Sequence, residues 1–80
     1  MNIRVTNLNL NTIDSELRKL FSRYGAVNST LIVRDKNNNR PNGSALIDMV
    51  KDSEARFAIE SLNQTIVDGK SISVVEVAEA

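Results

Sequence analysis

The chain has 80 residues, of which 41% are hydrophobic and 25% charged, a composition typical of a folded globular domain rather than a disordered segment. It contains neither Cys nor His, which excludes a disulfide framework and removes the commonest zinc ligands and the commonest general base. Ten basic residues balance ten acidic ones, so tight nucleic-acid binding would require the cations to be concentrated in one place. No stretch is apolar enough to cross a bilayer, and the N-terminus lacks the pattern of a secretory signal. We therefore expect one cytoplasmic domain, residues 1–80, without membrane association.

The first half of the chain predicts a strand, a helix and a second strand. Residues 3–8 alternate apolar Ile3 and Val5 with polar neighbours, as a strand does. Thr12 is the predicted N-cap of a helix that ends near Gly25. The buried stripe of this helix follows the i, i+3, i+4, i+7 pattern and consists of Leu17, Leu20, Phe21 and Tyr24. Residues 27–33 are rich in strand-forming residues.

The second half predicts a hairpin, a second helix and a last strand. The stretch RDKNNNRPNG, residues 34–43, has the Asn, Pro and Gly of a hairpin loop. In the strand that follows, Ala45, Ile47 and Met49 share one face, and Ser44, Leu46 and Asp48 share the other. Asp52 or Ser53 is expected to cap a helix whose buried stripe is Ala55, Ala58, Ile59 and Leu62. A turn with Asp68 and Gly69 leads to a last strand, in which Ile72 and Val74 share a face.

The predicted order of elements is β-α-β-β-α-β. This order is typical of the α+β, ferredoxin-like split βαβ architecture, in which a four-stranded antiparallel sheet carries two helices on one face. The other face of the sheet is then uncovered. Such a face must be polar or must bind a partner.

Four segments resemble those of the RNA recognition motif family, and together they cover nearly all of the chain. They are IRVTNL (3–8), LRKLFSRYG (17–25), NGSALIDM (42–49) and AIESLNQTIVDGKSISV (58–74). Asn39 stands where the family often has Gly. The resemblance implies binding of single-stranded RNA on the uncovered sheet face, and a first strand that begins almost at Met1 is similar to the stand-alone, single-domain members of bacteria.

The chain departs from the family pattern at the positions that stack on bases. The third-strand pattern is Lys/Arg, Gly, Phe/Tyr, Gly/Ala, Phe, Val, any, Phe/Tyr. Gly43 and Ala45 match it, but Ser44 and Leu46 replace the two outward rings, and Arg4 stands at the outward ring position of the first strand. The only aromatic residues are on predicted helices: Phe21, Tyr24 and Phe57. Because base–aromatic stacking contributes about 1–3 kcal/mol per base, we expect weak or atypical RNA binding.

The candidate RNA-binding residues follow from the resemblance and from side-chain chemistry. An Arg can stack on a base or reach a phosphate, loop cations can hold the backbone, polar strand residues can bond base edges, and aliphatic ones can pack on base faces. Asp48 repels phosphate but can accept from a base amine. The ten candidates are Arg4, Thr6, Asn7, Leu31, Arg34, Lys36, Arg40, Ser44, Leu46 and Asp48.

A different function remains open at this stage. Aliphatic residues expected on the uncovered face are also typical of a protein contact, which would make the chain a protein-interaction module that binds itself or another protein. These residues are Leu31, Val33, Leu46 and Val75. A register shifted by one residue in the second or fourth strand would instead bury some of them. Phe57 lies off the buried stripe, where it either folds over the core edge or anchors a partner.

The sequence does not indicate an enzyme. Its acidic residues are scattered, its three glycines form no phosphate-binding loop, and nucleophile-and-base arrangements lack His and Cys. We expect no cofactor and no metal.

Overall fold

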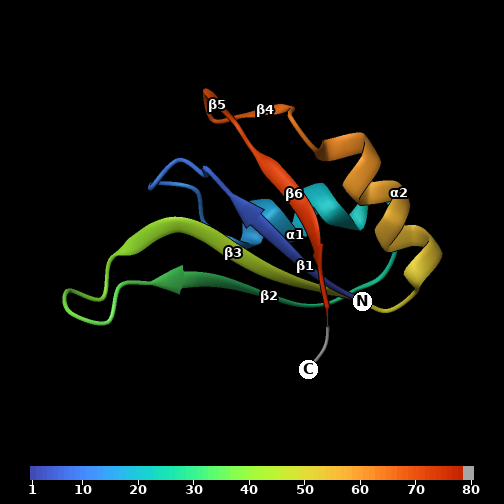
Figure 1. Cartoon of the computed structure of the whole chain (residues 1–80), viewed down its shortest axis with the longest axis horizontal. Helices are drawn as coiled ribbons and strands as arrows, with labels where there is room; N and C mark the ends of the chain where they lie inside the picture. Colours follow the sequence, from blue (N-terminus) through green and yellow to red (C-terminus); the bar gives the residue numbers. More distant parts are fainter. Residues whose placement is uncertain (79–80) are drawn as a thin grey trace.

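Four antiparallel strands form the main sheet in the computed structural model, which describes residues 1–78 (Figure 1). The strands lie in the order β2-β3-β1-β6, and their bounds are β1 Asn2–Thr6, β2 Val27–Arg34, β3 Pro41–Met49 and β6 Ser73–Val77. Two helices, α1 (Asp14–Ser22) and α2 (Asp52–Leu62), follow β1 and β3 in the chain. The ferredoxin-like α+β architecture predicted from the sequence is therefore confirmed.

A second, smaller sheet precedes the last strand. The two short strands β4 (Ile66–Val67) and β5 (Lys70–Ser71) pair across a two-residue turn and lie at the top of Figure 1. Asp68 and Gly69 both have positive φ, 50° and 84°, which is the geometry of the turn that best matches the twist of a hairpin. The sequence predicted this turn but not the two strands that flank it.

The core lies between the sheet and the two helices. Alternate strand residues point into it, and the predicted helix stripes meet them there. The fully or nearly buried apolar residues are Ile3, Val5, Leu8, Leu17, Phe21, Ala45, Ile47, Met49, Ala55, Ala58, Leu62, Ile72 and Val74. Leu20, Tyr24 and Ile59 pack against this core while remaining partly exposed. Within residues 1–78, neither helix is both long and apolar enough to span a membrane.

Both predicted helix caps are wrong. The N-cap residues are Ile13 and Lys51, and neither makes a side-chain capping bond. Thr12 is instead 3% exposed, and its hydroxyl donates to Asp68 Oδ2 at 2.7 Å, so the β4–β5 turn takes the bond that the cap would have made. Asp52 is the first residue of α2, where its carboxylate faces the positive end of the helix dipole without capping it. The first helix ends at Ser22, before Gly25 is reached.

Gly43 connects the start of β3 to the loop that follows β1. Its φ is +88°, and its carbonyl accepts a hydrogen bond of 2.9 Å from the backbone nitrogen of Leu8. A Cβ at this position would lie 3.3 Å from the Leu8 carbonyl oxygen. Both the backbone conformation and the close approach therefore favour glycine here.

Replacing Gly43 should destabilise the domain. We expect Gly43→Ala to lower the free energy of unfolding by about 1–3 kcal/mol, since a side chain held at positive φ is strained and Cβ also crowds Leu8. Urea denaturation followed by circular dichroism measures the change. Gly69→Ala is the matched control, because Gly69 also has positive φ but nothing lies within 4 Å of its added Cβ. Equal losses for the two variants would contradict a role for the contact with Leu8.

Two carboxyl groups meet where α1 faces the β4–β5 turn. A side-chain hydrogen bond to Asp68 raises the pKa of Glu16 above its ordinary value, and desolvation and repulsion by the Asp68 charge act in the same direction. A raised folded-state pKa means that this contact stabilises the fold while Glu16 is protonated. That contribution is present below the ordinary carboxyl pKa and is lost as the pH rises through the raised one.

Glu16→Gln should remove this pH dependence, because an amide keeps a donor for Asp68 at every pH. We expect the variant to gain stability relative to the wild type as the pH rises through the raised pKa of Glu16. Urea denaturation of both proteins across that range measures the difference. Asp14→Asn, which removes a charge from the same helix turn, is the control. A difference between wild type and Glu16→Gln that stays constant with pH would rule out the shared-proton contact.

Candidate nucleic-acid interface

One row of side chains crosses the open face of the main sheet. Arg4 on β1 lies opposite Leu46 on β3 and opposite Val75 on β6, and Leu46 lies opposite Leu31 on β2. The row therefore reads Val75, Arg4, Leu46, Leu31 across all four strands. Its aliphatic members are 49%, 36% and 60% exposed for Val75, Leu46 and Leu31. The outward residues predicted for the second and the last strand, which are β2 and β6 in the structure, are confirmed. The alternative, in which a shift of one residue buries some of them, is wrong.

Two shallow depressions flank Leu46 on this face. One has a volume of about 320 Å³, and its lining combines the Arg4 guanidinium and two hydroxyls with aliphatic side chains: Arg4, Thr6, Val33, Ser44, Ala45 and Leu46. The other has a volume of about 280 Å³ and holds a carboxylate between aliphatic walls; its lining is Asn2, Ser29, Leu31, Leu46, Ile47, Asp48 and Val77. The face thus combines an apolar row with a basic region on one side and an acidic group on the other.

No aromatic ring lies on this face. The three rings of the chain belong to Phe21 in α1, Phe57 in α2 and Tyr24 in the turn after α1. Ser44 and Leu46 occupy the outward positions of β3, as predicted, while Met49 is fully buried and fills the core. The stacking platform expected of the family is therefore replaced by Arg4 and aliphatic side chains.

The predicted cation cluster lies at the tip of the β2–β3 hairpin, which extends beyond the other elements on the left of Figure 1. Asn39 has a φ of 57° and donates its backbone N–H to the Asp35 carbonyl at 2.8 Å, so it fulfils the role of the glycine that the family often has there. The Arg34 guanidinium donates to the Asn39 carbonyl at 3.3 Å. Lys36 and Arg40 are exposed on the same loop. Three cations thus gather at one end of the open sheet.

The polar candidate residues differ in whether their side chains already form hydrogen bonds within the protein. The Asn7 amide donates to the Ser71 carbonyl at 2.7 Å and so ties the end of β1 to β5. Thr6 and Ser44 are half-buried and line the basic depression. The Asp48 carboxylate accepts from Asn28 Nδ2 at 2.9 Å and forms an ion pair with the N-terminal ammonium of Met1 at 3.5 Å.

Sequence reasoning missed three residues of this face: Asn2, Ser29 and Val77, which surround Asp48. Ser29 lies there because it continues the register of Leu31 and alternates onto the same face; the β2–β3 pairing shifts by one residue only before it, between Val27 and Ser29, and turns Val27 toward the core. The irregular stretch Asn28, Ser29, Thr30 was the available signal of such a bulge. Asn2 and Val77 lie opposite each other on β1 and β6 and could have been placed by extending the strands.

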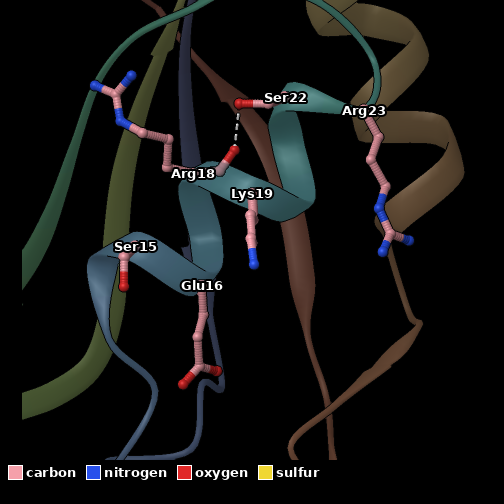
Figure 2. Close-up of a pocket in the computed structure, with 6 residues that line it drawn as sticks. All are labelled: Ser15, Glu16, Arg18, Lys19, Ser22 and Arg23. Atoms are coloured by element: carbon pink, nitrogen blue, oxygen red, sulfur yellow. Dashed lines mark hydrogen bonds between the residues drawn. The ribbon is translucent and has the colours of Figure 1, made fainter.

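A third surface hollow does not form a convergent site. It has a volume of about 620 Å³, and all of its lining residues come from α1 and the residue after it (Figure 2): Ser15, Glu16, Arg18, Lys19, Ser22 and Arg23. In Figure 2 the Arg18, Lys19 and Arg23 side chains point in different directions. Arg18 is also turned toward β2, where it donates to the Val27 and Asn28 carbonyls at 3.3 and 3.4 Å. Across residues 1–78, no three His, Cys, Asp or Glu side chains are arranged to hold a metal ion.

Comparison with known proteins agrees with this geometry. Residues 3–73 match the RNA recognition motif. The chain is 43% identical over 70 residues to the sex-lethal homolog of Musca domestica and 40% identical over 70 residues to protein sex-lethal of Drosophila melanogaster. Each alignment covers 88% of this chain. These alignments cover only 22% and 20% of the two fly proteins, so the chain spans about a fifth of the length of these relatives.

Solved structures share the whole fold. RNA binding protein PG1 is 35% identical with a TM-score of 0.95, and the match covers 100% of this chain and 96% of that protein. A sex-lethal protein/RNA complex is 38% identical with a TM-score of 0.84, and the match covers 92% of this chain and 46% of that one. On the sequence match, the strand order and the structural likeness, the chain belongs to the RNA recognition motif family.

Proposed function

We propose that the chain binds single-stranded RNA on its open sheet face, weakly and without aromatic stacking. The observation that carries the proposal is the exposed row in which Arg4 lies between Leu46 and Val75. Family membership supports RNA binding in general, as does the structural likeness to a protein solved in complex with RNA. A cytoplasmic location remains a prediction from the sequence.

In this proposal Arg4 and Leu46 together act as the surface for a base. A guanidinium plane stacks on a base much as a ring does, and it also attracts the phosphate groups nearby. Leu46 and Leu31 add apolar area beside it, and both are well exposed. Aliphatic contacts are weaker than ring stacking, so the affinity per base is expected to fall below that of family members with the full platform.

The hairpin cations supply the second part of the binding energy. Lys36 and Arg40 lie on the exposed tip of the β2–β3 loop, and Arg34 lies at its base. Each phosphate that such groups neutralise releases counterions, so binding should weaken as the salt concentration rises. Because the whole chain has no net charge, this local cluster is what a phosphate backbone would meet.

Arg4→Ala tests the proposal directly. We expect it to weaken binding of mixed single-stranded RNA at low salt by about tenfold, since it removes one stacking surface worth about 1–3 kcal/mol. Fluorescence anisotropy measures the dissociation constant. Arg56→Ala is the matched control, because it removes the same charge from exposed α2 rather than from the sheet.

The result that would refute RNA binding on this face is a wild-type protein that binds no RNA at low salt, or an Arg4→Ala protein whose affinity equals that of Arg56→Ala. NMR shift mapping with short RNA gives an independent check. Perturbed amides should fall on β1 and β3 and at the β2–β3 loop.

A second candidate function is protein contact through Phe57. This side chain is 59% exposed and packs edge-on against Tyr24, with ring centroids 5.4 Å apart and an interplanar angle of 76°. An exposed ring fixed by a neighbouring ring loses little freedom when a partner covers it, which suits an anchor for self-association or for another protein.

Phe57→Ser distinguishes the two functions. If Phe57 mediates self-association, wild-type sedimentation should depend on protein concentration and the variant should sediment as a monomer. Ile66→Ser is the control, because Ile66 is also exposed, at 72%, but lies on β4. A wild-type monomer at every concentration would exclude self-association, and capture of a partner that survives Phe57→Ser would exclude an anchoring role for this ring.

A further inference from the structure

We propose that the depression around Asp48 selects guanine, the base whose Watson–Crick edge presents two adjacent N–H donors. This inference rests on the proposed RNA binding and adds a base preference to it. It starts from an apparent conflict. A carboxylate lies on the very face that is proposed to contact a polyanion.

The Asp48 carboxylate belongs to a second row of side chains that crosses the strands of the sheet. Asp48 lies opposite Asn2 on β1 and opposite Ser29 on β2, and Asn2 lies opposite Val77 on β6. This row runs beside that of Arg4 and Leu46. Residues two apart on a strand are separated by roughly 7 Å, so a base lying over Leu46 can direct its polar edge toward Asp48.

Two contacts hold the Asp48 carboxylate in place, but they do not occupy all of its acceptor positions. Asn28 Nδ2 donates to Oδ2 at 2.9 Å, and the N-terminal ammonium of Met1 forms an ion pair with Oδ1 at 3.5 Å. An ionised carboxyl group offers about four lone-pair positions, and the Asp48 side chain is 35% exposed. The group therefore has a fixed orientation, together with acceptor capacity directed to the surface.

Electrostatics determine which part of a nucleic acid can approach this group. A phosphate would be repelled, and it finds cations instead at Arg4 and at the β2–β3 loop. A base edge with N–H donors is attracted, and the bond is charge-assisted and therefore stronger than a neutral one. Leu31, Leu46 and Val77 form aliphatic walls beside the carboxylate, and a base lying over them would shield the bond from water and strengthen it further.

The four bases differ in what they offer a carboxylate. Guanine presents N1–H and the N2 amino group side by side, so both carboxylate oxygens can accept at once. Adenine and cytosine place an acceptor nitrogen beside their single amino group, and uracil flanks its one N–H with carbonyl oxygens. A paired contact of this type discriminates by about 1–3 kcal/mol, from which we expect a preference of about tenfold for guanine.

The test uses labelled oligouridines of about eight nucleotides and variants in which one position carries G, A or C. We expect the wild-type protein to bind the oligomer with G at one position about tenfold more tightly than its A, C and U counterparts. Asp48→Asn should abolish this difference, because an amide offers one acceptor and one donor. Its affinity for the all-U oligomer should persist or rise, since a charge that repels phosphate is removed.

Asp35→Asn is the matched control. Asp35 lies at the start of the β2–β3 loop and accepts from the Asn37 backbone nitrogen, a bond that the amide oxygen of Asn can keep. Removing its charge should strengthen binding of every oligomer by the same factor and leave the preference for G intact.

The outcomes separate this inference from the proposal on which it rests. Oligomers that bind equally well with or without G, or a G preference that survives in Asp48→Asn, would overturn the inference and leave RNA binding standing. Oligomers that do not bind at all would overturn both. The comparison among oligomers needs only the wild-type protein, so the inference stays testable even if Asp48→Asn does not fold.

Discussion

The pairing of β1 with β3 is the constraint on which the rest of the molecule depends. Ile3 lies opposite Ile47 in the core, and Arg4 lies opposite Leu46 on the open face. A slip of one residue would turn one of the two strands over, burying either the Arg4 guanidinium or the Asp48 carboxylate and exposing Ile3 or Ile47, at a cost far larger than a small domain can bear. The register that builds the core therefore also fixes which side chains a ligand can meet.

In the proposed binding mode, loss of the rings changes the source of binding energy rather than the place of binding. A ring platform binds any base, because every base has a π-face. With Arg4, Leu46 and Asp48 in its place, less energy comes from stacking, and a larger share comes from charge and from hydrogen bonds to base edges. Those contacts depend on the identity of the base and on salt, so a weaker surface of this kind is also a more selective one.

The sequence predicted the faces of the sheet well because strict alternation of residues 44–49 has only one arrangement that buries Ala45, Ile47 and Met49. It failed where a long-range contact competes with a local rule. Thr12 has the local signature of a cap, but its hydroxyl bonds Asp68, 56 residues away. The pairing shift between Val27 and Ser29 turns Val27 toward the core and obscures the alternation that places Ser29 beside Leu31 on the open face. The acidic depression was therefore only partly visible from the sequence.

The zero net charge of the chain is consistent with a surface that relies on base-edge contacts more than on phosphate neutralisation. Non-specific affinity for nucleic acid comes from counterion release, and it grows with the number of phosphates that a protein neutralises. Only four of the ten basic residues belong to the proposed interface, Arg4, Arg34, Lys36 and Arg40, so RNA bound there would release few counterions. In the proposed mode the specificity ratio then depends on the contacts that read base edges, and the Asp48 carboxylate would penalise a misplaced phosphate and reward a donor edge. On the proposed surface an acidic residue would contribute to selectivity because it disfavours contact with phosphate.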